Sequence, residues 1–362
     1  MQSTLIGIFK MTKLNFGEDG KFFEAVVGRS EIKMLSDENL QSHYGDSRIL
    51  IIGAGGSIGS AISRRLEAAQ ISDLFFLDHD ESALHSLALS MSNSSASQSD
   101  RYLLADIRDF YSTKNAIRTV KPTIVVHAAA LKHLVTLERF PREGYLTNIE
   151  GTLNVAIACR DLRVNQLINI STDKAANPIS VLGQTKKIAE LIAEEVFINS
   201  ELLQCSVRFG NVFASRGSVI ETFVHQISNY VPVTITDLKV SRFFMSHNEA
   251  ANLVLAAASL KESGTYIQNM GQEVKIIDVV NRIATFLERS ATTMIIGLQK
   301  GEKLNEELYD GPTSPTKFNE ISRSVHQVNL GLINEIRKNS PISNEDALVK
   351  IAKLMSEYVL KK

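Results

Sequence analysis

RILIIGAGGSIG, residues 48–59, is the stretch of sequence that decides the fold. Its apolar run from Ile49 to Ile52 has the length of a buried strand, and the residues from Ser57 to Ala69 have the spacing of a helix. Gly53, Gly56 and Gly59, in a G-x-x-G-x-x-G pattern that runs from the strand into the helix, allow a tight turn and let the backbone approach a diphosphate at the helix N-terminus. The stretch therefore predicts a strand, a turn and a helix that bind a dinucleotide. The alternative is a turn that serves packing alone.

Further short apolar runs follow this unit along the chain. They span residues 74–77, 102–104, 123–127, 165–170 and 203–207, and helical patterns separate them. Short apolar strands that alternate with helices are typical of βαβ units, whose parallel sheet is buried on both faces. The sequence therefore predicts an α/β protein with a Rossmann-like, doubly wound parallel sheet and a smaller C-terminal lobe that binds the substrate.

The predicted organisation has four parts. These are an N-terminal leader (1–47), a nucleotide-binding domain (48–209), a region that forms mainly the smaller lobe (210–322) and a helical tail (323–362). Some segments of the third part can return to the main sheet. Within that part we expect turns and loops over 210–244, and helices over 248–260 and 277–289. The serine-rich stretch 90–99 predicts a solvated loop.

Composition bounds the class of protein. The chain has 362 residues, with 39 Lys and Arg against 40 Asp and Glu, and a formal net charge of −1. This balance argues against a large polyphosphate-binding surface, so nucleic acid is not an expected partner. No stretch reaches the ~18–20 apolar residues of a membrane span, and the N-terminus lacks the features of a signal peptide. The expectation is a soluble, cytoplasmic protein.

Cysteine usage and metal-ligand spacing bound the chemistry further. Cys159 and Cys205 are too few for a disulfide framework or a thiolate metal cage in so long a chain. No group of His, Cys and Asp residues has the spacing of a metal site. We therefore predict that no metal is bound.

Two acidic residues follow predicted strands and are candidates to bind a nucleotide. Asp78 ends the second strand, where a carboxylate accepts hydrogen bonds from adenosine ribose hydroxyls and repels a 2′-phosphate, which favours NAD over NADP. Asp106 follows the third strand, where its carboxylate can meet the adenine edge. The alternative for Asp78 is an acidic residue that faces water at a strand end.

Four polar residues, Ser171, Thr172, Asp173 and Lys174, follow the fifth predicted strand. Because ligands of open α/β sheets bind outside the carboxyl ends of the strands, these side chains are candidates to reach a nicotinamide and its substrate. A desolvated Lys beside a carboxylate can act as a base, and the Asp as an acid. Lys186, twelve residues after Lys174, can reach the nicotinamide ribose. The alternative for these charged residues is a solvated surface.

Several motifs, in the same order along the chain, resemble the extended short-chain dehydrogenase/reductase superfamily. They are the glycine turn and the blocks 127–133 (HAAALKH), 147–152 (TNIEGT), 171–174 (STDK) and 208–212 (RFGNV). Within the superfamily the chain is most similar to the polysaccharide-biosynthesis, CapD-like UDP-N-acetylglucosamine 4,6-dehydratases. The segments that carry this closer likeness are 28–32 (GRSEI), 215–220 (SRGSVI), 241–245 (SRFFM) and 301–308 (GEKLNEEL). The likeness covers roughly residues 25–310.

The resemblance implies a reaction on a UDP-sugar with tightly bound NAD. Oxidation at C4 makes the C5 proton acidic, Lys174 removes that proton, and Asp173 protonates the departing C6 hydroxyl. Hydride then returns to C6, which gives a UDP-2-acetamido-2,6-dideoxy-4-hexulose. In this scheme Thr172 forms a hydrogen bond near O4, and Lys186 binds the nicotinamide ribose and lowers nearby pKa values by its charge.

The resemblance also distributes the binding residues. Besides Lys186, the cofactor is expected to contact Gly53, Gly56, Ser57, Ile58, Gly59, Asp78, Asp106, Ile107, Ala128 and Ala129. The substrate is expected to contact Lys132, His133, Asn211, Arg216, Arg242 and Glu302. Arg242, with Arg216 nearby, suits the diphosphate because a guanidinium matches phosphate oxygens with paired donors, and Arg208 is a third candidate. Glu302 suits the uridine ribose. The alternative for each Arg is an ion pair within the protein.

One position departs from the superfamily pattern. The usual Tyr, four residues before the helix Lys, is Leu182 here, and Leu cannot move a proton. Thr172 relayed to Lys186 or to water, or Asp173, are the candidates to replace it. A catalytically inactive NAD-binding paralogue and a UDP-hexose 4-epimerase are the alternative functions, although an epimerase does not need the Asp173–Lys174 pair. By resemblance a homo-oligomer is expected, and the sequence leaves the configuration at C5 open.

Overall fold

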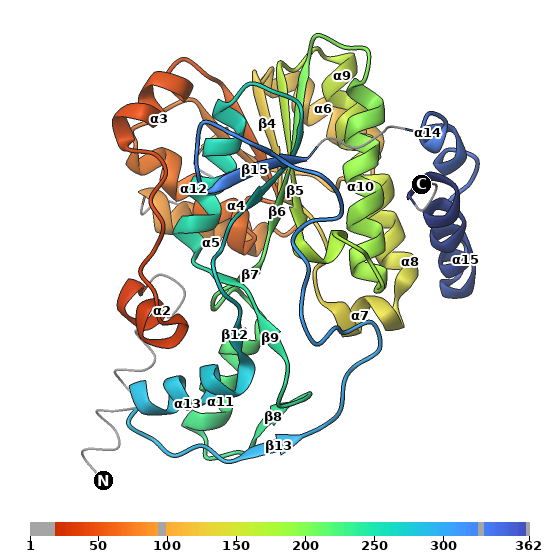
Figure 1. The fold of residues 1–362 in the computed structure, drawn as a ribbon. Coiled ribbons are helices and arrows are strands. Elements are labelled where there is room, and N and C mark those ends of the chain that lie inside the picture. The colour runs from red at the N-terminus through yellow and green to blue at the C-terminus, as the bar shows by residue number, and fades with distance from the viewer. Residues whose placement is uncertain (1–18, 93–98, 325–328, 360–362) are drawn as a thin grey trace.

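The computed structural model describes residues 19–92, 99–324 and 329–359, and its main feature is a nine-stranded sheet (Figure 1). The strand order is β14-β15-β11-β6-β5-β4-β1-β2-β3. These strands are β1 (Ile49–Ile52), β2 (Leu74–Asp78), β3 (Tyr102–Leu104), β4 (Ile124–His127), β5 (Gln166–Thr172), β6 (Leu203–Phe209), β11 (Gly264–Gln268), β14 (Ser314–Pro315) and β15 (Ile321–Ser324). All neighbours from β3 to β11 pair in parallel, while β15 runs antiparallel to β11 and to β14. The predicted doubly wound fold is confirmed.

Helices cover both faces of the sheet, which is why its central strands are apolar throughout. All four residues of β1 are at most 1% exposed, as expected of a strand that is buried on both sides. One face carries α3 (Asp37–Tyr44), α4 (Ser57–Ala68), α5 (Glu81–Ser92) and α12 (His247–Ser259). The other carries α6 (Phe110–Val120), α9 (Gly151–Asp161) and α10 (Val181–Phe197). Short helical segments, α7 (Leu134–Arg139), α8 (Pro141–Gly144) and the π-helix η2 (Tyr145–Glu150), connect β4 to α9.

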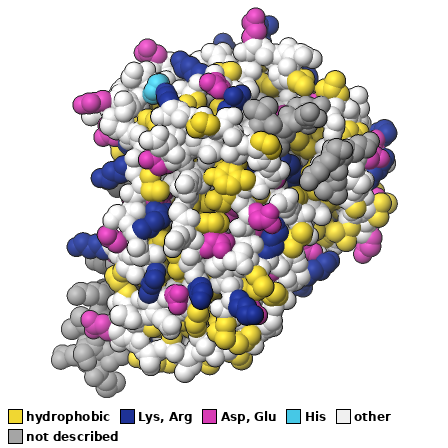
Figure 2. All heavy atoms as spheres, in the orientation of Figure 1, with side chains coloured by type: hydrophobic (Ala, Val, Ile, Leu, Met, Phe, Trp, Pro, Cys, Tyr) yellow, Lys and Arg dark blue, Asp and Glu magenta, His cyan; other side chains and the backbone are white. Residues whose placement is uncertain are grey.

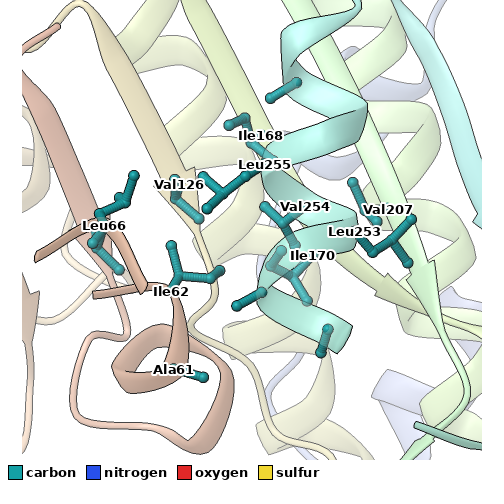
Figure 3. Close-up of a cluster of buried hydrophobic side chains, with 14 of the residues drawn as sticks. Ala61, Ile62, Leu66, Val126, Ile168, Ile170, Val207, Leu253, Val254 and Leu255 are labelled. Carbon is teal, nitrogen blue, oxygen red and sulfur yellow. The ribbon is translucent and has the colours of Figure 1, made fainter. Parts of the chain in front are cut away.

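The packing of α4 and α12 shows how the first face is built (Figure 3). Side chains of α4, such as Ile62, and of α12, such as Leu253, point toward Val126 of β4 and Ile170 of β5. Each of these four side chains is less than 10% exposed. Burial of a whole aliphatic side chain contributes about 1.5–3 kcal/mol, so this layer fixes the sheet against its helices.

A smaller lobe lies at the carboxyl ends of the parallel strands, below the sheet in Figure 1. It contains α2 (Gly20–Val27), α11 (Val219–Ser228), α13 (Ile276–Phe286) and the strands β7 (Asn211–Val212), β8 (Val233–Ile235), β9 (Ser241–Arg242), β10 (Phe244–Met245), β12 (Val274–Lys275) and β13 (Thr293–Ile295). The strands form three small pairs, β7 with β10, β8 with β13 and β9 with β12. The lobe has its own apolar core, which includes Phe213, Phe223 and Ile283.

The described part of the leader joins the two cores. Phe22 of α2 packs on Phe213 of the lobe, with ring centroids 5.2 Å apart. Beyond it, Arg29 forms an ion pair with the buried Glu249 of α12. Tyr44, at the end of α3, then donates a hydrogen bond to the carbonyl oxygen of Leu255 in the main domain, with an O···O distance of 2.5 Å. The leader therefore packs on the lobe at one end and on the sheet domain at the other.

The C-terminal tail packs on α10. It contains α14 (Leu332–Ile336), α15 (Asn344–Leu354) and the π-helix η4 (Met355–Val359). Glu195 of α10 accepts hydrogen bonds from the backbone N–H groups of Gly331 and Ile333, at 2.8 and 3.1 Å, and so satisfies donors at the start of α14.

The structure differs from the sequence predictions in three places. Turns and loops were expected over 210–244, but this segment contains the ten-residue helix α11. The strand β11 returns to the main sheet, as the prediction for 210–322 allowed, whereas β15 crosses the predicted boundary and reaches into the tail. Ser90 to Ser92 end α5, while residues 93–98 of the predicted serine-rich loop lie outside the described residues.

On the face shown in Figure 2, neither basic nor acidic side chains gather into a large patch. Figure 2 shows basic and acidic side chains interspersed over this face, in line with the near-zero net charge. Within the described ranges, no helix is long and apolar enough to cross a membrane. In the same part of the chain, no group of three or more His, Cys, Asp or Glu side chains is placed to hold a metal ion.

Candidate functional site

The glycine turn after β1 leaves the N-terminus of α4 open to a ligand. Gly53 has a φ of +79°, which disfavours any other residue. A Cβ at Gly59 would lie 2.1 Å from the Gly53 carbonyl oxygen, so the helix can approach the turn this closely only without a side chain. Gly56 is the N-cap residue and supplies no side-chain hydrogen bond. Backbone N–H groups at the start of α4 therefore remain available to an anion.

Asp78, at the end of β2, stabilises the glycine turn by a hydrogen bond. Its carboxylate is 7% exposed. One oxygen accepts a hydrogen bond from the Gly55 N–H at 2.9 Å, and the other accepts from the Asp80 N–H at 3.1 Å. The Asp78 Oδ1 also lies 3.2 Å from the His79 Nδ1, while the Oδ2 keeps a second lone pair, so the predicted contact with ribose hydroxyls remains open.

A cavity of about 460 Å³ lies beside this turn, within the size range of small-molecule sites. Of the predicted cofactor residues, Gly53, Gly56, Asp78, Asp106, Ile107, Ala128 and Ala129 line it. Ser57, Ile58 and Gly59 instead form the first turn of α4. The sequence analysis missed several further lining residues, among them Arg108, Thr136, Phe140 and Thr147. Thr147 belongs to the block 147–152, whereas no local pattern marks the other three, which come from loops and short helical segments.

Asp106 is engaged by an arginine that the sequence analysis did not consider. The guanidinium of Arg108 donates to both carboxylate oxygens of Asp106, at 2.6 to 3.1 Å. Burial raises the pKa of Asp106, but the hydrogen bonds from Arg108 outweigh burial, and the pKa lies below its ordinary value. The Asp106–Arg108 pair lies at the rim of the cavity as a unit.

Arg216 lies at the cofactor turn, where the sequence analysis did not place it. Its backbone N–H donates to the Ser57 hydroxyl at 3.1 Å, and its guanidinium Nη2 lies 3.5 Å from the Gly55 carbonyl oxygen. Arg216 also lines the nucleotide cavity. Its positive charge therefore adds to the anion-binding character of the turn.

The predicted acid and base lie together at the end of β5. The Lys174 Nζ is 3.0 Å from the Asp173 Oδ1, and the Thr172 hydroxyl donates to the same oxygen at 2.9 Å. The Asn211 side-chain oxygen accepts from the Lys174 Nζ at 3.2 Å. Asp173 is fully buried. The structure therefore brings together four of the predicted site residues from β5, β7 and the 3₁₀ turn η3 (Asp173–Ala175).

Close packing fixes this turn against α10. A Cβ at Gly183 would lie 2.2 Å from the Lys174 carbonyl oxygen, so only glycine allows the first turn of α10 to contact η3. Ser180 caps α10 by accepting a hydrogen bond from the Gly183 N–H at 3.1 Å. The acid and base therefore stand on rigid elements.

Lys186 is buried on α10 without a hydrogen-bonding partner among the described residues. Its side chain is 5% exposed. Burial lowers the pKa of Lys186 to about 8, with a partial opposing effect from the charge of Glu190. Leu182, which replaces the usual Tyr, lies one helical turn earlier and is 5% exposed. A buried amine that lacks a protein partner is suited to bind ligand hydroxyls.

The lowered pKa of Lys186 predicts a pH-dependent cost to stability. Between pH 8 and 10.5 the unfolded chain binds more protons than the folded one, so the free energy of unfolding rises with pH across this window. Below pH 8 the buried ammonium costs on the order of 3 kcal/mol. We expect Lys186→Met to raise the free energy of unfolding by up to this amount at pH 7, with the gain vanishing near pH 10.5. Urea unfolding at both pH values, with the exposed Lys239→Met as the matched control, tests this.

Asn148 and His127, two buried polar residues near Lys186, were not predicted as site residues. Asn148, on η2, holds the loop after β4 by donating to the Leu131 carbonyl oxygen at 3.0 Å and accepting from its N–H at 2.9 Å. The Thr152 hydroxyl donates to the Asn148 carbonyl oxygen, so the His127 Nε2, 3.0 Å away, is the donor to that hydroxyl. Burial, and then the charge of Lys186, lower the pKa of His127 to about 3. The blocks 127–133 and 147–152 contained the signal for both.

The loop after β4 also reaches the lobe through Lys132 and His133. The Lys132 Nζ donates to the Ser215 hydroxyl at 3.2 Å. The His133 ring covers Gly217, where a Cβ would lie 2.7 Å from the ring Cε1. These two predicted substrate residues therefore contact the 215–217 segment, which also contains Arg216.

Arg242 and Glu302 pair with each other, which differs from their predicted roles on separate parts of a nucleotide. The Arg242 Nη2 donates to the Glu302 carboxylate at 3.1 Å and to the Lys303 carbonyl oxygen at 2.9 Å. Its Nη1 donates to the carbonyl oxygens of Ser241 and Leu304. The four terminal N–H groups are therefore used within the protein, and Arg242 organises the 302–306 segment around itself.

Arg208 is not a diphosphate ligand in this structure. It is 1% exposed and donates to both carboxylate oxygens of Glu190, at 2.7 and 2.8 Å. It also donates to both carboxylate oxygens of Asp310, at 2.8 and 2.9 Å. Arg208 thus fulfils the alternative that an ion pair within the protein accounts for the arginine.

Comparison with known proteins places this geometry in context. A dTDP-glucose 4,6-dehydratase from Streptomyces venezuelae, solved with NAD bound, superposes with a TM-score of 0.65 over 86% of this chain and 97% of that chain. The two sequences are 18% identical, so this match speaks for a shared fold.

Sequence relatives are closer. The "Capsular polysaccharide biosynthesis protein CapD" of Staphylococcus aureus is 36% identical over 291 residues, which cover 79% of this chain and 48% of that protein. The chain thus spans about half the length of this relative. A "UDP-glucose 4-epimerase" of Rickettsia prowazekii is 33% identical over 73% of this chain and 77% of that protein. The family model described as "Polysaccharide biosynthesis protein" matches residues 49–325. The chain therefore belongs to this polysaccharide-biosynthesis family of extended short-chain dehydrogenases/reductases, which confirms the resemblance found in its motifs.

Proposed function

We propose that this chain is an NAD-dependent UDP-N-acetylglucosamine 4,6-dehydratase. The observation that carries the proposal is the Asp173–Lys174 pair, 3.0 Å apart at the carboxyl end of β5. An acid beside a base is what the loss of water across C5 and C6 requires, whereas a 4-epimerase does not need it. Membership of the polysaccharide-biosynthesis family supports a nucleotide-sugar substrate.

The cavity beside the glycine turn fits a dinucleotide. Gly53, Gly56 and Arg216 line the cavity beside the open N-terminus of α4, where backbone N–H groups and the charge of Arg216 suit a diphosphate. Asp78 offers oxygen lone pairs to ribose hydroxyls, and Lys186 offers its amine to the nicotinamide ribose. When bound, NAD supplies the oxidation at C4 and the return of hydride at C6.

The elimination itself falls to Lys174 and Asp173. With a 4-keto sugar in the site, the Lys174 amine takes the C5 proton, the electron pair of the C5–H bond forms the C5=C6 double bond, and the C6–O bond breaks. Asp173 gives its proton to the departing hydroxyl, which leaves as water. Thr172 orients the acid through its hydrogen bond to Oδ1, and Asn211 orients the base.

The Thr172–Asp173 hydrogen bond also suggests how the enzyme works without Tyr at position 182. The Thr172 hydroxyl proton points at the Asp173 Oδ1, 2.9 Å away. A proton released from the C4 hydroxyl can pass to the Thr172 oxygen while Thr172 passes its own proton to Asp173. We propose that this relay converts Asp173 from carboxylate to acid before it is needed at C6.

Substrate contacts in this proposal come from Lys132, His133 and Asn211, with Arg242 and Glu302 shaping the segment that faces them. We further propose that the chain acts in the cytoplasm as a homo-oligomer. Cys159 and Cys205 are buried free thiols, which suits a reducing compartment.

A UDP-hexose 4-epimerase is the second candidate, favoured by the Rickettsia relative of that name. Incubation of the purified protein with UDP-N-acetylglucosamine in D₂O, followed by NMR, separates the two. A dehydratase gives a new C6 methyl signal with solvent deuterium at C5. A product inverted at C4 would instead establish an epimerase, and no turnover of any UDP-hexose would identify an inactive paralogue.

A further inference from the structure

A second carboxylate faces Lys174 from the lobe. The Glu306 side chain is 3% exposed, and its Oε1 lies 3.4 Å from the Lys174 Nζ. Lys174 is therefore held between Asp173 of the sheet domain and Glu306 of the 302–306 segment. Glu306 belongs to the block 301–308, and no role was predicted for it from the sequence.

Asp173 and Glu306 each keep one buried oxygen without a hydrogen-bonding partner among the described residues. These atoms are the Asp173 Oδ2 and the Glu306 Oε2. Buried carboxylate oxygens are nearly always satisfied, and leaving one unpaired costs about 1–3 kcal/mol. Two such atoms on both sides of one lysine indicate that these carboxylates exchange protons or meet a ligand.

Glu306 is held in place by other residues of the lobe. The Glu273 Oε1 accepts from the Glu306 N–H at 3.1 Å, and the Glu273 Oε2 accepts from the Asn305 side chain at 2.8 Å. The Arg242 Nε lies 3.9 Å from the Glu306 Oε1, and Arg242 in turn pairs with Glu302. The position of Glu306 is thus built rather than incidental.

Lys174 must lose a proton before it can act as a base. Burial lowers the pKa of Lys174, but attraction to Asp173 and Glu306 outweighs burial, and the pKa lies above its ordinary value. Lys174 is therefore an ammonium ion before the reaction. An ammonium has no lone pair to take the C5 proton, so a proton must leave Lys174 first.

We propose that Glu306 accepts this proton and thereby makes Lys174 the base. The inference rests on the proposed function, and it assigns Glu306 as a positioning residue that acts through Lys174. An N–H bond of the Lys174 ammonium breaks as an O–H bond of Glu306 forms, which leaves a neutral amine beside a neutral carboxylic acid. The amine then takes the C5 proton, and the electron pair of the C5–H bond forms the double bond while Asp173 protonates the departing hydroxyl.

The charges around the cluster permit this transfer. Lys174 and Arg242 are its cations, and Asp173, Glu306, Glu302 and Glu273 are its carboxylates. Carboxylates outnumber cations, so protonating Asp173 through Thr172 does not give the cluster a net positive charge. Once Asp173 is neutral, it no longer holds the Lys174 proton by charge, and Glu306 is the remaining carboxylate within 4 Å of that proton among the described residues.

Glu306→Gln tests the proposal because glutamine keeps the size and the acceptor oxygen but cannot take a proton. With UDP-N-acetylglucosamine in D₂O we expect incorporation of deuterium at C5 to fall by about 10²–10⁴-fold. Reduction of the bound cofactor, seen by its near-ultraviolet absorbance, should persist, since oxidation at C4 does not use Glu306. Glu306→Asp keeps a carboxylate and is expected to restore part of the exchange. Glu307→Gln, at the exposed neighbouring position, is the matched control.

The outcomes separate the two proposals. Wild-type protein that neither reduces its cofactor nor exchanges C5 overturns the proposed function, and this inference with it. Active wild type together with Glu306→Gln that exchanges at the wild-type rate overturns this inference alone. If Glu306→Gln does not fold, Glu306→Asp decides: slowed exchange with intact C4 oxidation supports the proposal, and equal loss of both steps overturns it.

Discussion

Lys174→Ala is expected to lose exchange of the C5 proton with solvent while it keeps its bound cofactor. The Lys174 Nζ contacts Asp173, Asn211 and Glu306, and Lys174 is not among the residues that line the nucleotide cavity. Removal of a general base typically costs about 10²–10⁴-fold in rate. We therefore expect dehydration to fall by at least this range, without loss of NAD on gel filtration.

Two measurements check this result. NMR in D₂O follows deuterium at C5, and the absorbance of the purified protein reports its cofactor content. Lys300→Ala, which removes a 75% exposed lysine that pairs with Glu138 of α7, is the matched control and should exchange normally. Exchange that persists in Lys174→Ala would remove Lys174 as the base, and a variant that loses NAD would show that Lys174 supports the cofactor site instead.

The sheet and the glycine turn were predictable because their determinants are local. A buried parallel strand is a short apolar run, and Ile49 to Ile52 form one with glycines directly after it. The Asp173–Lys174 pair could be predicted as well, since it follows a strand at the edge where ligands bind. In each case, neighbours within a few residues set the geometry.

The roles of the arginines were not predictable, since they depend on distant partners. Arg208 lies near the end of the seven-residue strand β6, and Arg242 lies in the two-residue strand β9. Arg208 meets Asp310, which is 102 residues away in sequence, and Arg242 meets Glu302, which is 60 residues away. Whether a guanidinium faces a ligand or a carboxylate of the protein is decided by the tertiary fold, and the sequence carries no sign of it.

The helix α11 was not predicted, although its capping residue and its apolar spacing are present in the sequence. Ser218 caps it by accepting a hydrogen bond from the Glu221 N–H, and a Ser followed three residues later by Glu is a helix start. Ile220, Phe223 and Ile227 then follow at helical spacing and are all buried.

Glu190→Gln is expected to destabilise the protein strongly, because Glu190 is the buried partner of Arg208. Glu190 is fully buried and accepts from Arg208 at 2.7 and 2.8 Å and from the Ser171 hydroxyl at 2.6 Å. Removing one partner of a buried ion pair costs about 3–5 kcal/mol, because the remaining charge stays buried. We expect the free energy of unfolding at pH 7 to fall by this amount, as measured by urea unfolding.

The loss should depend on pH with a definite sign. Burial raises the pKa of Glu190, but the charge and hydrogen bonds of Arg208 outweigh burial and lower it to about 2, from an ordinary value of 4.5. A carboxylate whose pKa is lowered by folding stabilises the protein fully above the unfolded value, and this contribution is lost as the pH falls toward 2. The difference between wild type and Glu190→Gln is therefore expected to be constant above pH 5 and to shrink below pH 4.5.

The same network connects stability to the site, because Asp310 follows the segment that carries Glu302 and Glu306. Arg208 binds Asp310 at 2.8 and 2.9 Å and so anchors the end of that segment to β6. Glu201→Gln, at an exposed position between α10 and β6, should change the free energy of unfolding by less than about 0.5 kcal/mol. A Glu190→Gln protein as stable as this control would mean that Asp310 alone neutralises Arg208, and the carboxylate of Glu190 would then be dispensable to the fold.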